Sequence, residues 1–265
     1  MAQWIGVQHN GEYRFGKLVK EMVVLCTGNM FDSPEETDET FPFSDAVLDI
    51  PCSPTKVVAL WNNSRGVAMK HGLEQPDNPL VFIKTSNTYL PSGGVIRKPN
   101  NYDGRVIFEA ELGIVIGREV YNASHIEAAE SIFGYTCIND VTATQIIGEN
   151  DNFAQWTRAK NFNTFTPMGP TISSNVELAD VNIRAELNGR ERQKYSLSDL
   201  FFGPEKLVHL ISSFMTLYPG DIISCGTGLG ALPMRPGMQI DVIIDGIGTL
   251  SNTFCDSAPS LERND

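Results

Sequence analysis

The stretch Phe108-Glu109-Ala110-Glu111-Leu112-Gly113 sets two carboxylates two residues apart in a run that otherwise has the composition of a strand. Because successive side chains of a strand point to opposite faces, Glu109 and Glu111 are expected to share one face. Two acids held close together repel each other unless a proton or a cation lies between them. The stretch therefore predicts a strand that carries a binding site.

A second apolar run, Ile132–Ile138, delivers Asn139-Asp140. Asp140 would add a third hard oxygen ligand to Glu109 and Glu111, and such a set suits Mg²⁺ or Mn²⁺. The alternative is that Glu109 and Glu111 line a solvated strand face, which is the commoner fate of an isolated E-x-E. The flanking apolar runs favour the metal site, because acids at the ends of buried strands are costly without a partner.

The composition excludes several classes of protein. A chain of 265 residues, 42% of them apolar, suits one substantial domain or a large domain with a small appendage. The net charge of −12 argues against nucleic-acid binding, which needs a basic surface. An anionic substrate would have to be attracted by local positive charge or by a metal.

The chain also predicts a cytoplasmic protein without a membrane segment. It has no run of about 18 apolar residues, and Met1–Gly6 lacks the basic and apolar regions of a signal peptide. The five cysteines lack metal-type spacing and are expected to be reduced.

Two domains are expected, a small N-terminal domain over 1–52 and a catalytic domain over 53–265. In the first, Asn10-Gly11 predicts a hairpin turn between strands within Trp4–Leu18. Asp32–Asp38 is acidic and is expected to form a solvated loop, followed by a strand at Val47–Ile50.

In the second domain, short apolar runs predict many short strands and few helices. The fold class expected is therefore α+β and rich in strands, with a mixed, curled sheet. Helices are expected at 124–131, where Ser124 and Glu127 form a capping box, and at 207–217, with a short helix or lid at 67–73. Strands are expected at 57–60, 80–84, 106–117, 132–138, 178–187, 222–225, 238–244 and 247–252, and 141–166 is expected to be the least regular and most polar stretch.

The chain resembles the fumarylacetoacetate hydrolase family over roughly residues 56–253. The resemblance depends on the order and spacing of several motifs, each weak alone. These are Leu80–Lys84, Phe108–Leu112, Gly134–Asp140, Arg158–Thr164, Phe214–Asp221 and Gly226-Thr227-Gly228.

The resemblance implies a β-roll or sandwich catalytic domain, a small N-terminal domain and a homodimer. It also implies a divalent metal held at the positions of Glu109, Glu111 and Asp140. Members of the family cleave or rearrange 2-oxo, 2,4-dioxo or 2-hydroxydienoic acids.

The resemblance also suggests residues that contact the substrate. Lys160 would bring a second positive charge to the oxo-acid oxygens, although a polar loop is also an ordinary place for a surface lysine. Thr227 and Gly228 would offer donors to an anion, or they form a simple hairpin turn. Lys84 resembles a lysine beside the cleft and could equally be a snorkelling residue at a strand end. Asn63 matches the start of the family's lid.

The lid departs from the family pattern. Many members carry H-x-x-E there, with the His as base and the Glu orienting it. Those positions hold Val67 and Lys70 here, but His71 and Glu74 repeat the pattern one helical turn later. We therefore predict a shifted dyad of His71 and Glu74; the alternative is a coincidence on a solvated lid.

A second departure follows Asp140. Where the family usually has an arginine and often a glutamine, this chain has Thr144 and Ile147. The predicted substrate is therefore less anionic, or bulkier and more apolar, than a dicarboxylate. Trp61 and Trp156 flank segments that should border the cleft, where they could wall an apolar pocket or pack in the core.

These features predict a metal-dependent enzyme that cleaves a C–C bond in a 2-oxo or 2,4-dioxo acid, by hydrolysis or decarboxylation. Loss of the usual dyad weakens the case for hydrolysis more than for decarboxylation, because only hydrolysis needs an activated water. Two alternatives stay open: an isomerase or tautomerase of a 2-hydroxydienoate or dione, and an altered member that only binds a ligand.

Overall fold

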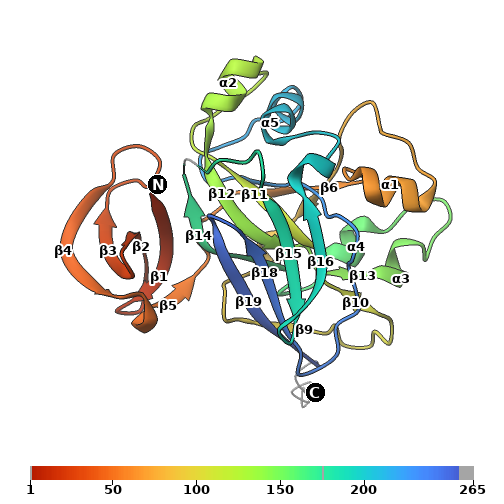
Figure 1. Cartoon of the computed structure of the whole chain (residues 1–265), viewed down its shortest axis with the longest axis horizontal. Coiled ribbons are helices and arrows are strands. Elements are labelled where there is room, and N and C mark those ends of the chain that lie inside the picture. The colour runs from red at the N-terminus through yellow and green to blue at the C-terminus, as the bar shows by residue number, and fades with distance from the viewer. Residues whose placement is uncertain (1, 175, 257–265) are drawn as a thin grey trace, which may run out of the picture.

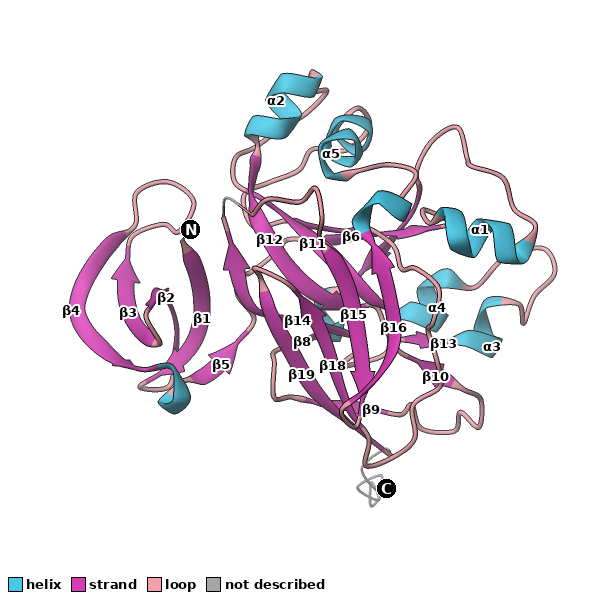
Figure 2. Cartoon of the chain, in the orientation of Figure 1, coloured by secondary structure: helices cyan, strands magenta, loops and turns pink. Residues whose placement is uncertain are grey.

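The computed structural model describes residues 2–174 and 176–256. Strands make up 43% of the chain and helices 16%, so the predicted strand-rich fold is confirmed (Figure 2). Most neighbouring strands are antiparallel, but β17 pairs with β6 and β19 with β9 in parallel, so the sheets are mixed as expected.

The N-terminal strands form an antiparallel group at one side of the molecule (Figure 1). The group consists of β1 (Gln3–His9), β2 (Glu12–Val19), β3 (Met22–Thr27), β4 (Glu35–Pro42) and β5 (Val47–Asp49). The predicted hairpin joins β1 to β2, and Asn10 and Gly11 take positive φ values of 53° and 81°. Positive φ values at both turn residues suit a tight hairpin turn whose twist matches that of the two strands.

The prediction of a solvated loop at Asp32–Asp38 is wrong at its second half, because β4 begins at Glu35. This strand pairs only with β3, so it forms the edge of the sheet. Its acidic side chains are exposed, and Lys17 of β2 contacts Glu36 at 2.7 Å. Charge on an edge strand keeps other chains from pairing with it, which explains an acidic sequence in a strand.

The remaining strands form the main body. They are β6 (Val57–Trp61), β7 (Leu80–Lys84), β8 (Tyr89–Leu90), β9 (Val95–Arg97), β10 (Val106–Ile107), β11 (Ala110–Ile116), β12 (Ile132–Asn139), β13 (Thr142–Ala143), β14 (Thr166–Ser173), β15 (Asn182–Leu187), β16 (Arg190–Ser196), β17 (Ile222–Ser224), β18 (Gln239–Ile244) and β19 (Gly248–Cys255).

Two large sheets enclose the main core. One continues from β1 through β14-β12-β11-β17-β6-β7, and the other runs β16-β15-β18-β19-β9 (Figure 2). Leu112 and Ile114 of β11 belong to the same buried cluster as Ile183 of β15 and Val242 of β18. The sheets therefore pack face to face through apolar side chains.

The helices are short and lie at the ends of the sheets (Figure 1). They are α1 (Arg65–His71), α2 (His125–Glu130), α3 (Thr144–Ile147), α4 (Trp156–Lys160) and α5 (Pro204–Ser212). The predicted capping box of α2 is present, with Ser124 N donating to Glu127 Oε2 at 2.8 Å. In the described part of the chain, none of the helices has the length and apolarity needed to cross a membrane.

Several elements differ from the sequence expectations. The helix expected to reach 217 ends at Ser212. Leu217 instead forms an isolated antiparallel β-bridge with Val120. The stretch 141–166, expected to be the least regular, contains the short elements β13, α3 and α4. Strands β14 and β16 were not expected, since β14 contains two prolines and β16 is polar in sequence.

The entry of the chain into β6 is fixed by Asp221, which is fully buried. Its Oδ1 accepts hydrogen bonds from Thr55 N at 3.0 Å, Thr55 Oγ1 at 2.6 Å and Lys56 N at 3.1 Å. Its Oδ2 accepts from Tyr218 N at 2.9 Å and contacts the Lys56 ammonium. A buried carboxylate with this many donors holds the segment between the N-terminal strands and the main body in one position.

Candidate metal centre

The ends of two neighbouring strands bring the three predicted acids together. Strands β11 and β12 are antiparallel with Ala110 opposite Asn139, so the start of one lies beside the end of the other. Glu109 lies just before β11 rather than inside a strand, and Asp140 just after β12. Asp140 N donates to Glu109 O at 2.9 Å, which fixes the two backbones side by side.

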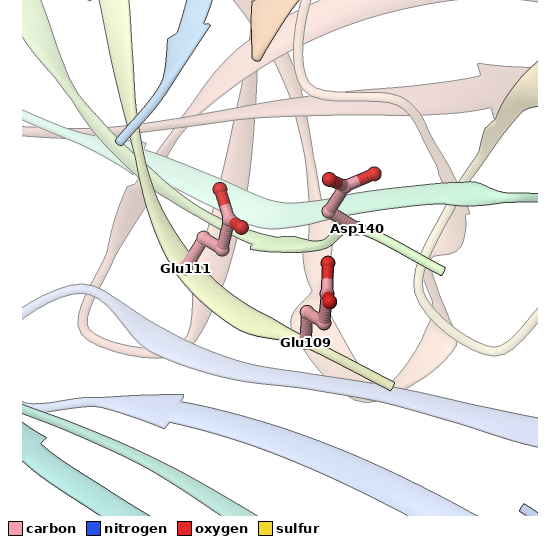
Figure 3. Close-up of side chains that lie close together, drawn as sticks. All are labelled: Glu109, Glu111 and Asp140. Carbon is pink, nitrogen blue, oxygen red and sulfur yellow. The ribbon is translucent and has the colours of Figure 1, made fainter. Parts of the chain in front are cut away.

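The three carboxylates converge on one point (Figure 3). One oxygen from each of Glu109, Glu111 and Asp140 lies within 4.8 Å of the others. Glu111 and Asp140 are each only 1% exposed, whereas the Glu109 side chain keeps 15% exposure. Like charges at this separation and burial need a compensating cation.

Two lysines partly compensate the charge. The Lys84 ammonium contacts Asp140 Oδ1 at 2.7 Å and donates to Phe165 O at 2.9 Å. The Lys160 ammonium contacts Asp140 Oδ2 at 2.6 Å and also Glu109 Oε2. Burial would raise the pKa of Asp140, but these two lysines outweigh it and hold the pKa below its ordinary value. The two sequence candidates Lys84 and Lys160 are thus both placed beside the acids.

Glu111 is held by neutral donors. Its Oε2 accepts from Ser224 Oγ at 2.5 Å and from Gly226 N at 2.9 Å, both near the end of β17. Burial, followed by the charges of Asp140 and Glu109, raises the pKa of Glu111 to about 8. Burial also raises the pKa of Glu109, against the opposing influence of Lys160.

The site fits a hard divalent cation. Three carboxylates face two ammonium groups, and burial together with the neighbouring negative charges raises the pKa of Glu111 to about 8. Carboxylate oxygens without histidine or thiolate are the ligand set of Mg²⁺, Mn²⁺ or Ca²⁺ rather than of softer metals. Glu109, Glu111 and Asp140 are the residues that would hold such an ion.

Two of the acids, Glu109 and Glu111, line a cavity of about 380 Å³, and Asp140 lies next to them outside the lining. Glu109, Glu111, Lys160 and Thr142 contribute its polar surface, and the lid helix α1 forms part of its wall. The volume is in the range of sites for small organic molecules. The arrangement can therefore hold a small anion against a cation and an ammonium group.

Thr227 and Gly228 line the same cavity, as the sequence suggested. Thr227 Oγ1 donates to Ala110 O at 3.0 Å and accepts from Gln193 Nε2 at 2.8 Å. Gln193 is 1% exposed, and its Oε1 also accepts from Ala110 N at 3.1 Å. Gln193 thus ties the glycine-rich loop to the start of β11, a role that sequence reasoning missed because β16 reads as a polar segment.

Asn63 lines the cavity, but its amide is committed to the backbone. Its Nδ2 donates to Phe202 O at 3.1 Å and to Cys225 O at 2.8 Å, and its Oδ1 accepts from Phe202 N at 2.9 Å. With the side chain only 2% exposed, Asn63 positions the base of the lid. Direct contact of Asn63 with a substrate stays a prediction.

The lid residues divide between the cavity and the solvent. Val67, Lys70 and His71 of the α1 segment line the cavity, whereas Glu74 lies outside this lining. His71 and Glu74 are both exposed, and the Glu74 carbonyl accepts from Asn62 Nδ2 at 3.0 Å. A pairing of the imidazole with the Glu74 carboxylate stays a prediction.

The two positions where family side chains are missing also face the cavity. Thr144 and Ile147 of α3 line it, as do Trp61 at the end of β6 and Trp156 at the start of α4. Trp61 and Trp156 contact each other with ring centroids 5.6 Å apart. The upper part of the cavity is therefore largely apolar.

Comparison with known families gives two matches. The model of the fumarylacetoacetate (FAA) hydrolase C-terminal domain matches residues 56–255, and that of an Rv2993c-like N-terminal domain matches residues 3–49. The first match contains all three acids and both lysines of the candidate centre.

Among known proteins, oxaloacetate tautomerase YisK of Bacillus subtilis is 34% identical over 77% of this chain and 70% of its own length. The 4-hydroxyphenylacetate degradation bifunctional isomerase/decarboxylase of Salmonella dublin is 34% identical over 76% of this chain and 47% of its own length. The crystal structure of a 2-hydroxyhepta-2,4-diene-1,7-dioate isomerase from Mycobacterium marinum is 32% identical, covers 98% of this chain and 100% of its own, and has a TM-score of 0.88.

The raised pKa of Glu111 predicts that binding of a divalent cation is coupled to proton release. Below a pH of about 8 the metal-free Glu111 carries a proton, which a cation must displace. Affinity for Mg²⁺ should therefore rise from pH 6 to pH 8 and level off above that pH. Calorimetric titration at pH 7 in two buffers of different ionisation enthalpy should report about one proton released per ion bound.

The matched control is Glu111→Gln, which cannot take up the proton. This variant should bind Mg²⁺ more weakly at pH 8 and lose most of the proton release at pH 7. An affinity for Mg²⁺ that does not change between pH 6 and pH 8 in the unmodified protein would contradict the prediction.

Proposed function

Because this chain belongs to the fumarylacetoacetate hydrolase family, we propose that it is a metal-dependent enzyme that moves a proton on a small 2-oxo acid, as a keto–enol tautomerase or double-bond isomerase. The observation that carries the proposal is the buried triad of Glu109, Glu111 and Asp140, of which Glu109 and Glu111 line a 380 Å³ cavity together with Lys160. The names of the similar tautomerase and isomerases support the same reaction class.

The reaction requires stabilisation of an enolate. A Mg²⁺ or Mn²⁺ ion held by Glu109, Glu111 and Asp140 would supply the positive charge opposite the oxo oxygen. Lys160 adds a fixed positive charge to the same floor. Burial would lower the pKa of Lys160, but Asp140, Glu109 and Glu111 outweigh it and raise the pKa above its ordinary value, so the ammonium stays charged at neutral pH.

The glycine-rich loop shapes the cavity beside the acid head. Thr227 and Gly228 form one wall, and the hydrogen bond from Gln193 to Thr227 Oγ1 holds that hydroxyl in place. Lys84 makes no contribution to the cavity lining and instead fixes Asp140 from behind. A preorganised set of donors and charges costs little reorganisation when negative charge develops on the substrate.

Proton transfer is assigned to His71. Its imidazole belongs to a residue of the cavity lining, and imidazoles are the commonest proton-transfer groups of enzymes. Glu74, three residues later, is the candidate to orient the ring. Besides stabilisation of the enolate, tautomerisation needs only a proton shuttle, whereas hydrolysis also needs a water activated at positions that here hold Val67 and Lys70.

Decarboxylation of a β-oxo acid is the second candidate. It passes through the same enolate, and it needs the charges of the floor but no water-activating base. The similarity to a bifunctional isomerase/decarboxylase supports this alternative.

Product analysis distinguishes the three reactions. With oxaloacetate and Mg²⁺, we expect faster interconversion of the keto and enol forms, followed by ultraviolet absorbance, without a change in product mass. Release of carbon dioxide above the metal-only rate would favour the second candidate, and two smaller acids from a 2,4-dioxo acid would favour hydrolysis. Activity that survives exhaustive chelation would contradict a metal-dependent reaction.

The assignment of His71 predicts that His71→Ala lowers the rate of proton transfer by a factor of about 10² to 10⁴, the usual range for a general acid or base. Because the side chain is exposed, the variant should keep the thermal stability and Mg²⁺ affinity of the unmodified protein. His9→Ala, on the N-terminal hairpin, is the matched control and should be fully active. Unchanged turnover in His71→Ala would contradict the predicted dyad of His71 and Glu74.

A further inference from the structure

We propose that the mouth of the cavity is an aromatic subsite, so that the preferred substrates are 2-oxo acids that carry a flat, apolar group beyond the acid head. This inference rests on the proposed function for the identity of the head group. The subsite itself is built from Trp61 and Trp156.

The cavity has a polar, buried floor and an exposed mouth, where apolar side chains lie beside Lys70 and His71 of the lid. At the floor, Glu111 is 1% exposed and Lys160 is 3% exposed. At the mouth, Trp61, Leu73 and Leu229 line the same cavity but are 37–40% exposed. A ligand with its acid group at the floor therefore extends outward between apolar side chains. Binding is stabilised there only if the ligand buries an apolar group against them.

The tryptophans form a wall of fixed geometry. Trp156 stacks on Phe82 with centroids 5.6 Å apart and an interplanar angle of 15°. Trp61 meets Trp156 at the same centroid distance but at 51°, so the two rings form an open angle rather than a closed stack. Aromatic faces set at an angle offer both a stacking and an edge contact to a flat ring.

Helix α4 fixes the distance between this wall and the floor. Trp156 and Lys160 are four residues apart, so they lie on one face of the helix with Cβ atoms roughly 5–6 Å apart. Phe82 lies between them, since the Lys160 ammonium is 5.1 Å from its ring centroid while Trp156 stacks on it. This spacing suits a ring attached one or two bonds beyond the oxo group.

The same region offers little to a second carboxylate. Thr144 and Ile147 are uncharged, and Lys70 is the cationic residue of the lid that lines the cavity. Lys70 is exposed, and an ion pair with an exposed lysine adds little binding free energy. The net charge of −12 also disfavours an additional negative charge on the substrate.

The test compares two enolisable 2-oxo acids that share a head group, phenylpyruvate and oxaloacetate. The unmodified protein should have the higher kcat/KM for phenylpyruvate in keto–enol interconversion. Trp156→Ala and Trp61→Ala should each lower the phenylpyruvate-to-oxaloacetate ratio by about tenfold or more, mainly through KM. Trp156→Phe should restore most of the ratio, and Phe153→Ala, an exposed aromatic outside the cavity lining, should leave it unchanged.

Equilibrium binding of the two acids to the Mg²⁺-loaded protein, measured by calorimetry, separates this inference from the proposed function. If neither acid is interconverted but phenylpyruvate binds about tenfold more tightly and Trp156→Ala abolishes the preference, the reaction assignment fails and the subsite stands. If oxaloacetate is preferred, and only Lys70→Ala changes the ratio, the subsite is overturned while the reaction assignment stands. Should Trp156→Ala fail to fold, Trp61→Ala at its exposed position gives the same decision.

Discussion

The enclosure of three carboxylates with only two ammonium groups is the constraint on which the rest of the site depends. Glu109, Glu111 and Asp140 cannot all be charged without a further cation, and the lysines that reach them satisfy Asp140 and Glu109 but leave Glu111 to neutral donors. Burial strengthens this imbalance because the interior screens charge poorly. A divalent cation would resolve it, and the same cation would supply the electron withdrawal that the proposed enolate chemistry requires.

Several elements of the fold hold the charged groups in place. Strands β11 and β12 present the acids at their adjoining ends, β7 brings Lys84, and α4 brings Lys160. The second sheet contributes Gln193, which fixes the start of β11 and the glycine-rich loop together. Above the floor, the lid and the tryptophans form a less polar mouth of the same cavity.

Much of this arrangement could be predicted from the sequence where one local rule decides the outcome. The proximity of Glu109 and Glu111, the Asn10-Gly11 turn and the Ser124 capping box all depend on neighbouring residues, and the structure has each of them in place, although Glu109 lies just before the strand. Elements that depend on distant partners were missed. Strand β4 is acidic because it is an edge, and α4 is too short for its periodicity to show. The buried role of Gln193 arises only when β16 meets β11.

The central claim is that one divalent cation lies between the three carboxylates. Anomalous diffraction from crystals soaked in Mn²⁺ tests it most directly, since it locates the ion without reference to any substrate. The account predicts a single strong peak within ligand distance of Glu109, Glu111 and Asp140. Absence of a peak at these three side chains at millimolar Mn²⁺, or a peak held by other residues, would contradict the account.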